Sequence, residues 1–306
     1  MRTSRRCLAA VQTAAMMSVL ALSACDSQKA TSSADTRTTK TPTTPAAAKT
    51  THLSADDFAT QRFDRSTVID NEWLPMRPGT RLVYEGAATE GSDRIARKII
   101  FIVTDLTKVI SGVRAVVVWE RDFNDGELIE SELAFFTQDN DGNVWHLGQY
   151  PEEYEDGKLD AAPAWIHGLA GARAGITMKK EPKLGAPDYA QGYAPPPINW
   201  VDRARVYKQG ERTCVRAGCY ENVLVTEEFE TGKPNASQLK YYAPGVGTVR
   251  VGWLGSAEDE KEVLELVEAV QLSPAEVAQV RKNALALEKN AYRVSKDVYA
   301  RTAPSE

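Results

Sequence analysis

The sequence predicts a mainly β fold: an antiparallel sheet or half-barrel built of two related β units, followed by a C-terminal α-helix. Three observations support this fold class. Between residues 75 and 272, short runs of alternating apolar and polar residues follow one another, a pattern typical of strands with one buried face. Turn signals such as Asn124-Asp125-Gly126 separate many of these runs. Finally, two stretches of this region are similar to each other, and a helix-start signal follows the last run.

Residues 1–24 predict an export signal peptide. Arg2, Arg5 and Arg6 stand before an apolar run over residues 8–22, and small residues follow the run. The run has about 15 residues, whereas a membrane-spanning helix needs roughly 20. We therefore expect this segment to be removed after export.

The tetrapeptide Leu22-Ser23-Ala24-Cys25 resembles the lipobox of bacterial lipoproteins. The resemblance implies that Cys25 receives acyl chains, palmitate among them, and becomes the first residue of the mature protein. The alternative is an ordinary signal peptide that happens to end near a cysteine. Two or three acyl chains would anchor the protein stably, because each buried methylene contributes about 0.8 kcal/mol. We expect a cell-envelope protein held by its lipid on the extracytoplasmic side of a bacterial membrane.

Charge and cysteine content narrow the partners and the compartment. The chain of 306 residues has a formal net charge of −5, and removal of the three signal arginines makes it −8. Because an acidic chain repels phosphates, we expect no nucleic-acid partner. With Cys7 in the signal and Cys25 acylated, Cys214 and Cys219 remain as a pair, which in an exported protein predicts a disulfide. A metal-binding or redox pair is the alternative, but no histidine lies nearby.

Residues 25–57 predict a disordered tether. The segment is rich in Thr and Ser, with Ala and Lys between them, and has almost no apolar residues to bury. We expect it to act as a spacer between the lipid and the β-rich domain.

The β-rich domain is predicted over residues 58–272. Its expected strands are 81–84, 97–104, 113–121, 128–137, 144–150, 203–207, 221–229, 239–243, 248–253 and 262–272. Residues 131–145 are similar to residues 237–250. Each stretch has Ser-x-Leu-x, then two aromatic residues, then a Gly-containing turn, and a Val after the turn. This similarity predicts two related β units, at about 75–150 and 185–272.

The domain also resembles a group of secreted bacterial β-rich proteins of no known activity. The resemblance rests on Asn71-Glu72-Trp73-Leu74-Pro75, Asp141-Gly142-Asn143-Val144-Trp145, Asn222-Val223-Leu224-Val225-Thr226 and Lys240-Tyr241-Tyr242-Ala243-Pro244-Gly245-Val246-Gly247. The last of these hairpins is similar to those of half-barrel lipoprotein carriers. The pair Cys214 and Cys219 departs from the group's pattern, and the resemblance implies no mechanism.

An irregular stretch, residues 151–198, separates the two units and could close over the sheet. Trp145, His146, Trp165 and His167 lie in or beside this stretch. Such aromatic side chains usually belong to a core, but near a long loop they are also typical of a ligand cleft. We therefore take these four residues as the candidate ligand cleft.

Residues 273–301 predict an amphipathic C-terminal helix. Ser273-Pro274-Ala275-Glu276 has the N-cap, the first-turn proline and the glutamate of a capping box. A narrow apolar stripe follows at alternating spacings of three and four residues. The stripe predicts packing on the protein's own domain, with a partner helix as the alternative.

No motif indicates catalysis, a metal site or a cofactor. The chain has three histidines, without the spacing of a zinc site, and it lacks a nucleophile elbow and a phosphate loop. Residues 139–143 imitate the start of a calcium loop, but Val144 replaces the invariant glycine, so a hairpin turn is favoured. The acidic run Glu152, Glu153, Glu155 and Asp156 is more typical of a solvated loop than of a catalytic pair.

These observations favour a lipid-anchored cell-envelope protein that is not an enzyme. Its β-rich domain is expected to bind a hydrophobic ligand or another envelope protein. One alternative is a hydrolase of envelope polymer that uses carboxylates of residues 151–198. The other is a purely structural envelope protein.

Overall fold

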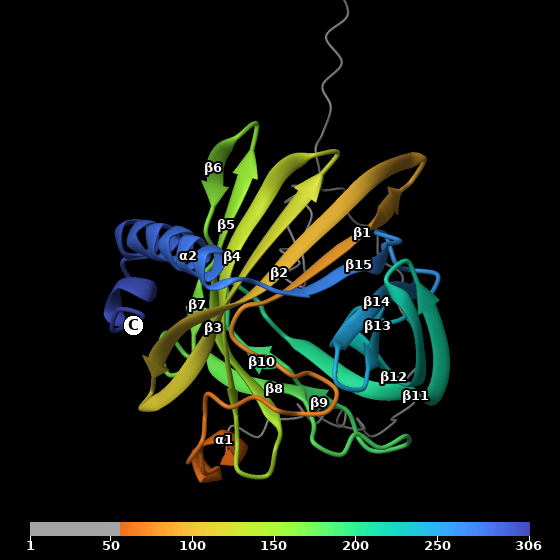
Figure 1. The fold of residues 1–306 in the computed structure, drawn as a ribbon, viewed down its shortest axis with the longest axis horizontal. Helices are drawn as coiled ribbons and strands as arrows, with labels where there is room; N and C mark the ends of the chain where they lie inside the picture. The colour runs from red at the N-terminus through yellow and green to blue at the C-terminus, as the bar shows by residue number, and fades with distance from the viewer. Residues whose placement is uncertain (1–55) are drawn as a thin grey trace, which may run out of the picture.

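The computed structural model describes residues 56–306. The predicted signal peptide, Cys25 and nearly all of the predicted tether lie outside the described residues. Within residues 56–306, fifteen strands form one antiparallel sheet (Figure 1). In the same part of the chain, no helix combines the length and the apolar character that crossing a membrane requires.

Two meanders make up most of the sheet. The first consists of β1 (Thr80–Glu90), β2 (Asp93–Ile110), β3 (Val113–Asn124), β4 (Glu127–Gln138) and β5 (Val144–Glu155). The second consists of β11 (Asp202–Val215), β12 (Gly218–Glu230), β13 (Ser237–Ala243), β14 (Gly247–Leu254) and β15 (Val263–Gln271). Pairing of β1 with β15 joins them into one sheet. These ten strands coincide with the ten predicted ones, and most are longer than the prediction.

Local sequence explains the tight hairpins. The turn between β3 and β4 places Asp125 and Gly126 at φ values of 47° and 91°. A two-residue hairpin turn with positive φ at both positions matches the right-handed twist of the flanking strands, and Asp-Gly tolerates it. Before the turn, β3 contains the β-branched run Val116 to Val118, which favours an extended backbone.

Short strands from the irregular stretch nearly close the sheet into a barrel. They are β6 (Lys158–Ala161), β7 (Trp165–Ile166), β8 (Arg173–Met178), β9 (Tyr189–Ala190) and β10 (Gly192–Tyr193). β8 pairs with β5, β10 pairs with β8, and β9 pairs with β11. Because only Gln191 separates β9 from β10, residues 189–193 connect the two edges of the sheet. The sheet is thus a nearly closed barrel, where the sequence predicted an antiparallel sheet or a half-barrel.

Gly175 permits this closure. A Cβ atom on Gly175 would lie 2.1 Å from the backbone nitrogen of Gly192 and 2.6 Å from the carbonyl oxygen of Ala190. Contacts this short with backbone atoms cannot be relieved by moving a side chain. A residue without a side chain is therefore required where β8 meets the closing segment.

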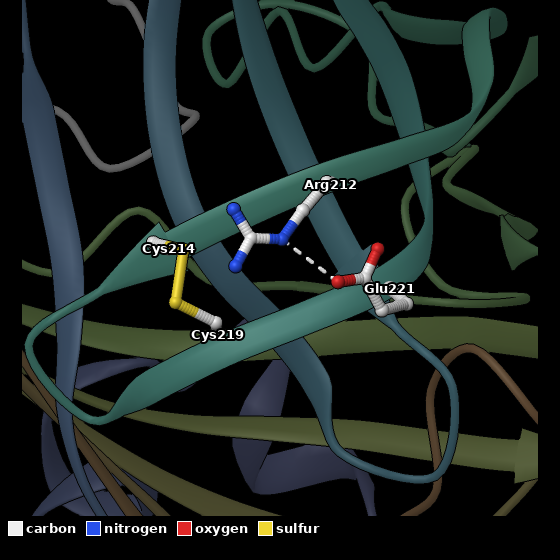
Figure 2. The surroundings of a disulfide bond; sticks show 4 residues. All are labelled: Arg212, Cys214, Cys219 and Glu221. Carbon is white, nitrogen blue, oxygen red and sulfur yellow. Dashed lines mark hydrogen bonds and ion pairs between the residues drawn. A yellow bond between two sulfur atoms is a disulfide. The ribbon is translucent and has the colours of Figure 1, made fainter.

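A disulfide joins β11 and β12 at the end of their hairpin, as the sequence predicted. Cys214 and Cys219 are cross-strand neighbours in the register of the two strands. Figure 2 shows the bond beside the exposed ion pair of Arg212 and Glu221, whose Nε–Oε1 distance is 2.8 Å. The pair lies outside the barrel's cavities, which neither cysteine lines.

The C-terminal helix α2 (Pro274–Val294) packs on the outer face of the barrel (Figure 1). Ser273 and Glu276 form the predicted capping box. The buried side chains of the helix are Val280, Ala284, Leu287, Glu288 and Ala291. The apolar ones share a core with outward-facing residues of β2 to β5, among them Leu106, Val117, Leu133 and Phe135. The helix thus packs on its own domain, and it ends before the short 3₁₀ turn η1 (Tyr299–Arg301).

A buried ion pair fixes the helix to the sheet. The Nζ atom of Lys108 in β2 lies 2.9 Å from Oε1 of Glu288, and both side chains are almost fully buried. Lys108 also donates to the carbonyl oxygen of Ala303 at 2.6 Å and lies over the ring of Tyr299. Burial lowers the pKa of Lys108, and the Glu288 carboxylate opposes that shift.

Replacing Glu288 with Ala should therefore destabilise the protein strongly. The change leaves the Lys108 ammonium buried without its carboxylate, and such a loss typically lowers the free energy of unfolding by about 3–5 kcal/mol. Urea unfolding measures the change. Lys289→Ala, at the next and exposed position, is the control and should alter the free energy by less than about 0.5 kcal/mol. Equal losses in the two variants would show that the ion pair has no special role.

Candidate functional site

The inner face of the first meander changes from apolar to acidic along its strands. On β3 the inward positions run Val116, Val118, Glu120 and Asp122, because alternate residues point to the same face. Their cross-strand neighbours on β4 are Phe136, Ala134, Glu132 and Glu130. One end of the lumen is therefore lined by hydrocarbon and the other by carboxyl groups.

The second meander repeats this gradient. Leu224 pairs with Tyr242 at one end of β12 and β13, Thr226 pairs with Lys240 in the middle, and Glu228 pairs with Gln238 beyond. The apolar ends of both meanders meet in one core, which contains Val116, Phe136, Leu224 and Tyr242. The two meanders thus point their polar ends toward the same end of the lumen.

Residues 69–76 close the apolar end. Asn71 is fully buried; its Nδ2 donates to the carbonyl oxygen of Gly142 at 2.9 Å, and its Oδ1 accepts from the backbone of Trp73 and Leu74. The carbonyl oxygen of Glu72 accepts from the backbone nitrogen of Gly245 at 2.7 Å. The segment therefore bridges the β4–β5 and β13–β14 hairpins, the two stretches that are similar in sequence. We call residues 69–76 the plug.

A cavity of about 200 Å³ lies between the plug and the acidic end. Its apolar wall includes Leu82, Phe101, Phe136, Val251 and Leu264. Among the described residues, its polar wall has one amine, Lys240, one imidazole, His146, and five carboxyl groups, those of Glu120, Glu132, Asp202, Glu228 and Glu262. The cavity is amphipathic, with an excess of acids at its polar end.

A second cavity, of about 100 Å³, adjoins the first at its polar end. The two share Asp202, Glu228, Gln238 and Glu262, and the second adds further acids, Glu230, Glu258 and Glu260. Lys233 is its one basic lining residue in the described part of the chain. We call this second cavity the acidic vestibule.

Two of the cavity's carboxylates have partners within the protein. Glu228 binds Lys240 at an Oε2–Nζ distance of 2.8 Å and accepts from Nε2 of Gln191 at 3.1 Å. Glu262 lies 3.2 Å from Arg97, and Arg97 also binds Glu260 at 2.8 Å. The basic groups of the lumen are thus occupied by these acids.

Glu120 and Glu132 have no such partner. They are directly opposite each other on β3 and β4, and Glu132 is only 9% exposed. Within residues 56–306, neither carboxylate forms a hydrogen bond or an ion pair, and no cluster of His, Cys, Asp and Glu could hold a metal ion. Like charges opposite each other on a sheet are destabilising. We call these two residues the carboxylate pair.

Burial makes the proton of each carboxyl group harder to remove. It raises the pKa of Glu120 to about 7, with Lys240 opposing and Glu262 adding to the shift. Burial, followed by the charge of Glu120, raises the pKa of Glu132 well above its ordinary value. Burial also raises the pKa of Asp202 to about 8. At neutral pH the polar wall therefore holds protons that exposed carboxylates would have released.

The four residues of the predicted cleft lie on two faces. His146 lines the cavity, stacks on Phe136 at 4.8 Å and contacts the ring of Trp165 at 4.9 Å. Trp145 lies on the opposite face of β5, where it and His167 both contact Phe58 of α1 (Asp56–Thr60). The structure thus brings His146 and Trp165 together and separates them from Trp145 and His167.

His146 lines the cavity and is almost fully buried. Its side chain is 6% exposed, and its Nε2 atom has no hydrogen-bond partner among the described residues. Burial lowers the pKa of His146 to about 3, although a backbone hydrogen bond at Gly148 opposes the shift. The ring is therefore neutral.

The predictions for the two acidic segments of the sequence fare differently in the structure. Residues 139–143 form a hairpin turn, as predicted: the Asp139 carboxylate accepts from the backbone nitrogen of Asn143 at 2.8 Å and from Nε1 of Trp145 at 2.7 Å. The prediction of a solvated loop is wrong for Glu152, which is buried on β5 and accepts from the hydroxyls of Tyr150 and Tyr154. Glu152 is held by tyrosines rather than by solvent.

Sequence reasoning missed the carboxylate pair, Asp202 and Lys240. The available signal was the change from acidic to apolar at alternate positions of β4, where Glu130, Glu132, Ala134 and Phe136 follow one another. Charged residues on one face of a strand usually indicate a solvated face. Only the closure of the barrel places this face inside.

Comparison with known proteins gives distant structural likenesses. No protein-family model and no curated protein matches the chain. A solved structure from Bacteroides fragilis, described as an exported protein with a YmcC-like fold, is 13% identical with a TM-score of 0.40, over 65% of this chain and 99% of that one. A structure from Parabacteroides distasonis, described as a lipoprotein, is 12% identical with a TM-score of 0.30 over the same shares. With TM-scores this low, nothing about this chain follows from them.

Neutralising the carboxylate pair should stabilise the protein at high pH. A carboxyl group whose pKa is raised on folding binds its proton more tightly in the folded state. For Glu120 the stability it contributes is therefore lost as pH rises from about 4.5 to about 7. The double variant Glu120→Gln/Glu132→Gln should melt roughly 2–6 °C above the wild type at pH 8 and close to it at pH 4.5.

Thermal unfolding at the two pH values measures this difference. Glu127→Gln, an exposed change on the same strand, is the control and should leave the pH profile unaltered. If the double variant melts at or below the wild-type temperature at pH 8, the charges of Glu120 and Glu132 are already compensated in the wild-type protein, which contradicts the prediction.

Proposed function

We propose that this protein is a lipid-anchored protein of the bacterial cell envelope, on the extracytoplasmic side, whose barrel binds a small amphipathic ligand in its lumen. The observation that carries the binding function is the cavity of about 200 Å³ with an apolar wall at one end and unpaired carboxyl groups at the other. Unpaired buried polar groups destabilise a fold unless a partner satisfies them. A bound ligand would supply that partner.

The cavity's size sets the class of ligand. An engineered cavity of about 150 Å³ in another protein takes benzene, so this lumen suits a single ring or a short chain. Pockets for drug-sized ligands are larger, at about 300–1,000 Å³. A whole acyl chain of a lipoprotein exceeds the cavity, and we therefore propose a small molecule rather than lipoprotein cargo.

The anchoring part of the proposal is supported by the sequence and by the cysteines. Residues 1–24 have the pattern of an export signal, and Leu22-Ser23-Ala24-Cys25 resembles a lipobox. The disulfide of Cys214 and Cys219 suits an oxidising compartment outside the cytoplasm. A hydrolase finds no comparable support, because the cavity's carboxylates come chiefly from the strands and not from residues 151–198.

Cys25→Ser should move the protein from the membrane fraction to the soluble fraction, because the acyl chains have no other attachment site. Fractionation with mass spectrometry of the mature N-terminus measures the effect. Cys7→Ser, which alters a cysteine inside the predicted signal, should leave the protein in the membrane fraction. An unmodified Cys25 in the wild-type protein would contradict lipid anchoring.

Filling the lumen should abolish ligand binding. Ala134 is buried and lines the middle of the cavity, so Ala134→Phe would occupy the space with its own ring. Native mass spectrometry of gently isolated protein should show a small-molecule adduct on the wild type and none on the variant. Lys158→Trp, an exposed change on β6, should keep the adduct, and circular dichroism verifies that both variants are folded. A wild-type protein isolated without any adduct would contradict the proposal.

A further inference from the structure

The charge of the ligand can be inferred from the groups that remain unsatisfied around the cavity. Glu120 and Glu132 are direct cross-strand neighbours, which places their Cβ atoms about 4.5–5.5 Å apart. Lys240, the one amine that lines the cavity in the described chain, is bound to Glu228. Lys240 also acts on Glu120 through its charge, but neither carboxylate of the pair has a hydrogen bond or an ion pair in the described chain.

His146 gives an independent indication of the same kind. The residue lines the same cavity and is 6% exposed, and its Nε2 atom has no hydrogen-bond partner in the described chain. An ammonium group donates up to three hydrogen bonds and accepts none. Two carboxylates and a neutral imidazole in the lining of one cavity form a complementary set for such a donor.

The charge of the acidic vestibule favours the same sign of ligand charge. Beside the acids that it shares with the cavity, the vestibule has Glu258, together with Glu230 and Glu260, which are paired with Lys233 and Arg97. A passage lined by one sign of charge concentrates ligands of the opposite sign. The acidic vestibule therefore repels anionic ligands such as fatty acids. The apolar wall beyond, with Phe101 and Phe136, would receive the ligand's hydrocarbon part.

We propose that the lumen selects organic amines: an ammonium group held by the carboxylate pair and by His146, on a small apolar body that extends toward the plug. This inference rests on the proposed binding function and specifies its ligand class. Benzylamine is a suitable probe, because a single ring fits the cavity and its amine is charged at neutral pH. Benzyl alcohol and benzoate are matched probes with a neutral and an anionic group on the same ring.

Isothermal titration calorimetry of the purified full chain with the three probes at pH 7.5 tests the inference, in nanodiscs if the chain is isolated with membranes. Benzylamine should bind about tenfold or more tightly than benzyl alcohol, and benzoate should bind weakest. In Glu120→Gln/Glu132→Gln the affinity for benzylamine should fall to about that for benzyl alcohol. The single variant Glu132→Gln tests the same point if the double variant does not fold. Glu127→Gln should behave as the wild type.

Proton release provides a second readout. The charged groups that face the carboxylate pair are Lys240, Glu262, Asp122, Glu130 and Glu153. Because the pair retains protons at neutral pH, binding of an ammonium group should displace them. Titrations in two buffers of different ionisation enthalpy should give different heats for benzylamine and equal heats for benzyl alcohol.

The outcomes separate the two levels of the proposal. Equal affinities for benzylamine and benzyl alcohol, with no proton release, would overturn the selection of amines and leave ligand binding intact. The absence of binding by all three probes would overturn both the inference and the proposal that the lumen takes a small apolar group.

Discussion

The alternation of side chains along the strands of a nearly closed barrel is the constraint on which the rest of the structure depends. Strands β2 to β5 send alternate residues outward to the core under α2 and the others inward to the lumen. The outer face of the first meander carries Val117, Leu133 and Phe135, and its inner face carries Glu120, Glu132 and Ala134. The same strands therefore provide both a stable wall and a polar interior.

The two faces treat buried charge differently. Outside, Lys108 and Glu288 satisfy each other, and the Glu288 carboxylate also accepts from the hydroxyl groups of Tyr299 and Ser305. Inside, Glu120 and Glu132 have no hydrogen bond or ion pair in the described chain, and only the more distant charge of Lys240 acts on Glu120. A fully satisfied buried network holds a structure together, whereas an unsatisfied one destabilises it. The outer core, the plug and the closing segment supply the stability that the lumen lacks, which is the usual arrangement where a site is kept for a ligand.

Local patterns predicted the elements well, and long-range closure limited the prediction of the site. The ten strands and the capped helix follow from alternation, turn residues and the capping box, all of which act over a few residues. Residues 189–193 have no such signal, because their two-residue strands depend on Gly175 and on edges far away in the chain. Without knowledge of that closure, the sequence pattern around Glu130 and Glu132 indicates a strand face exposed to solvent. The predicted cleft also placed Trp145 and His146 together, although consecutive residues of a strand point to opposite faces.

The central claim is that the lumen keeps carboxyl groups without a counter-ion, and measurement of their pKa values in the free protein tests it most directly. NMR of protein labelled with ¹³C at the glutamate carboxyl carbons, followed from pH 3 to pH 9, would resolve these titrations. One glutamate should titrate near pH 7, and the loss of its signal in Glu120→Gln would assign it to Glu120. Titration of every glutamate near the ordinary value of about 4.3 would contradict the account, because it would mean that solvent or cations already compensate the lumen.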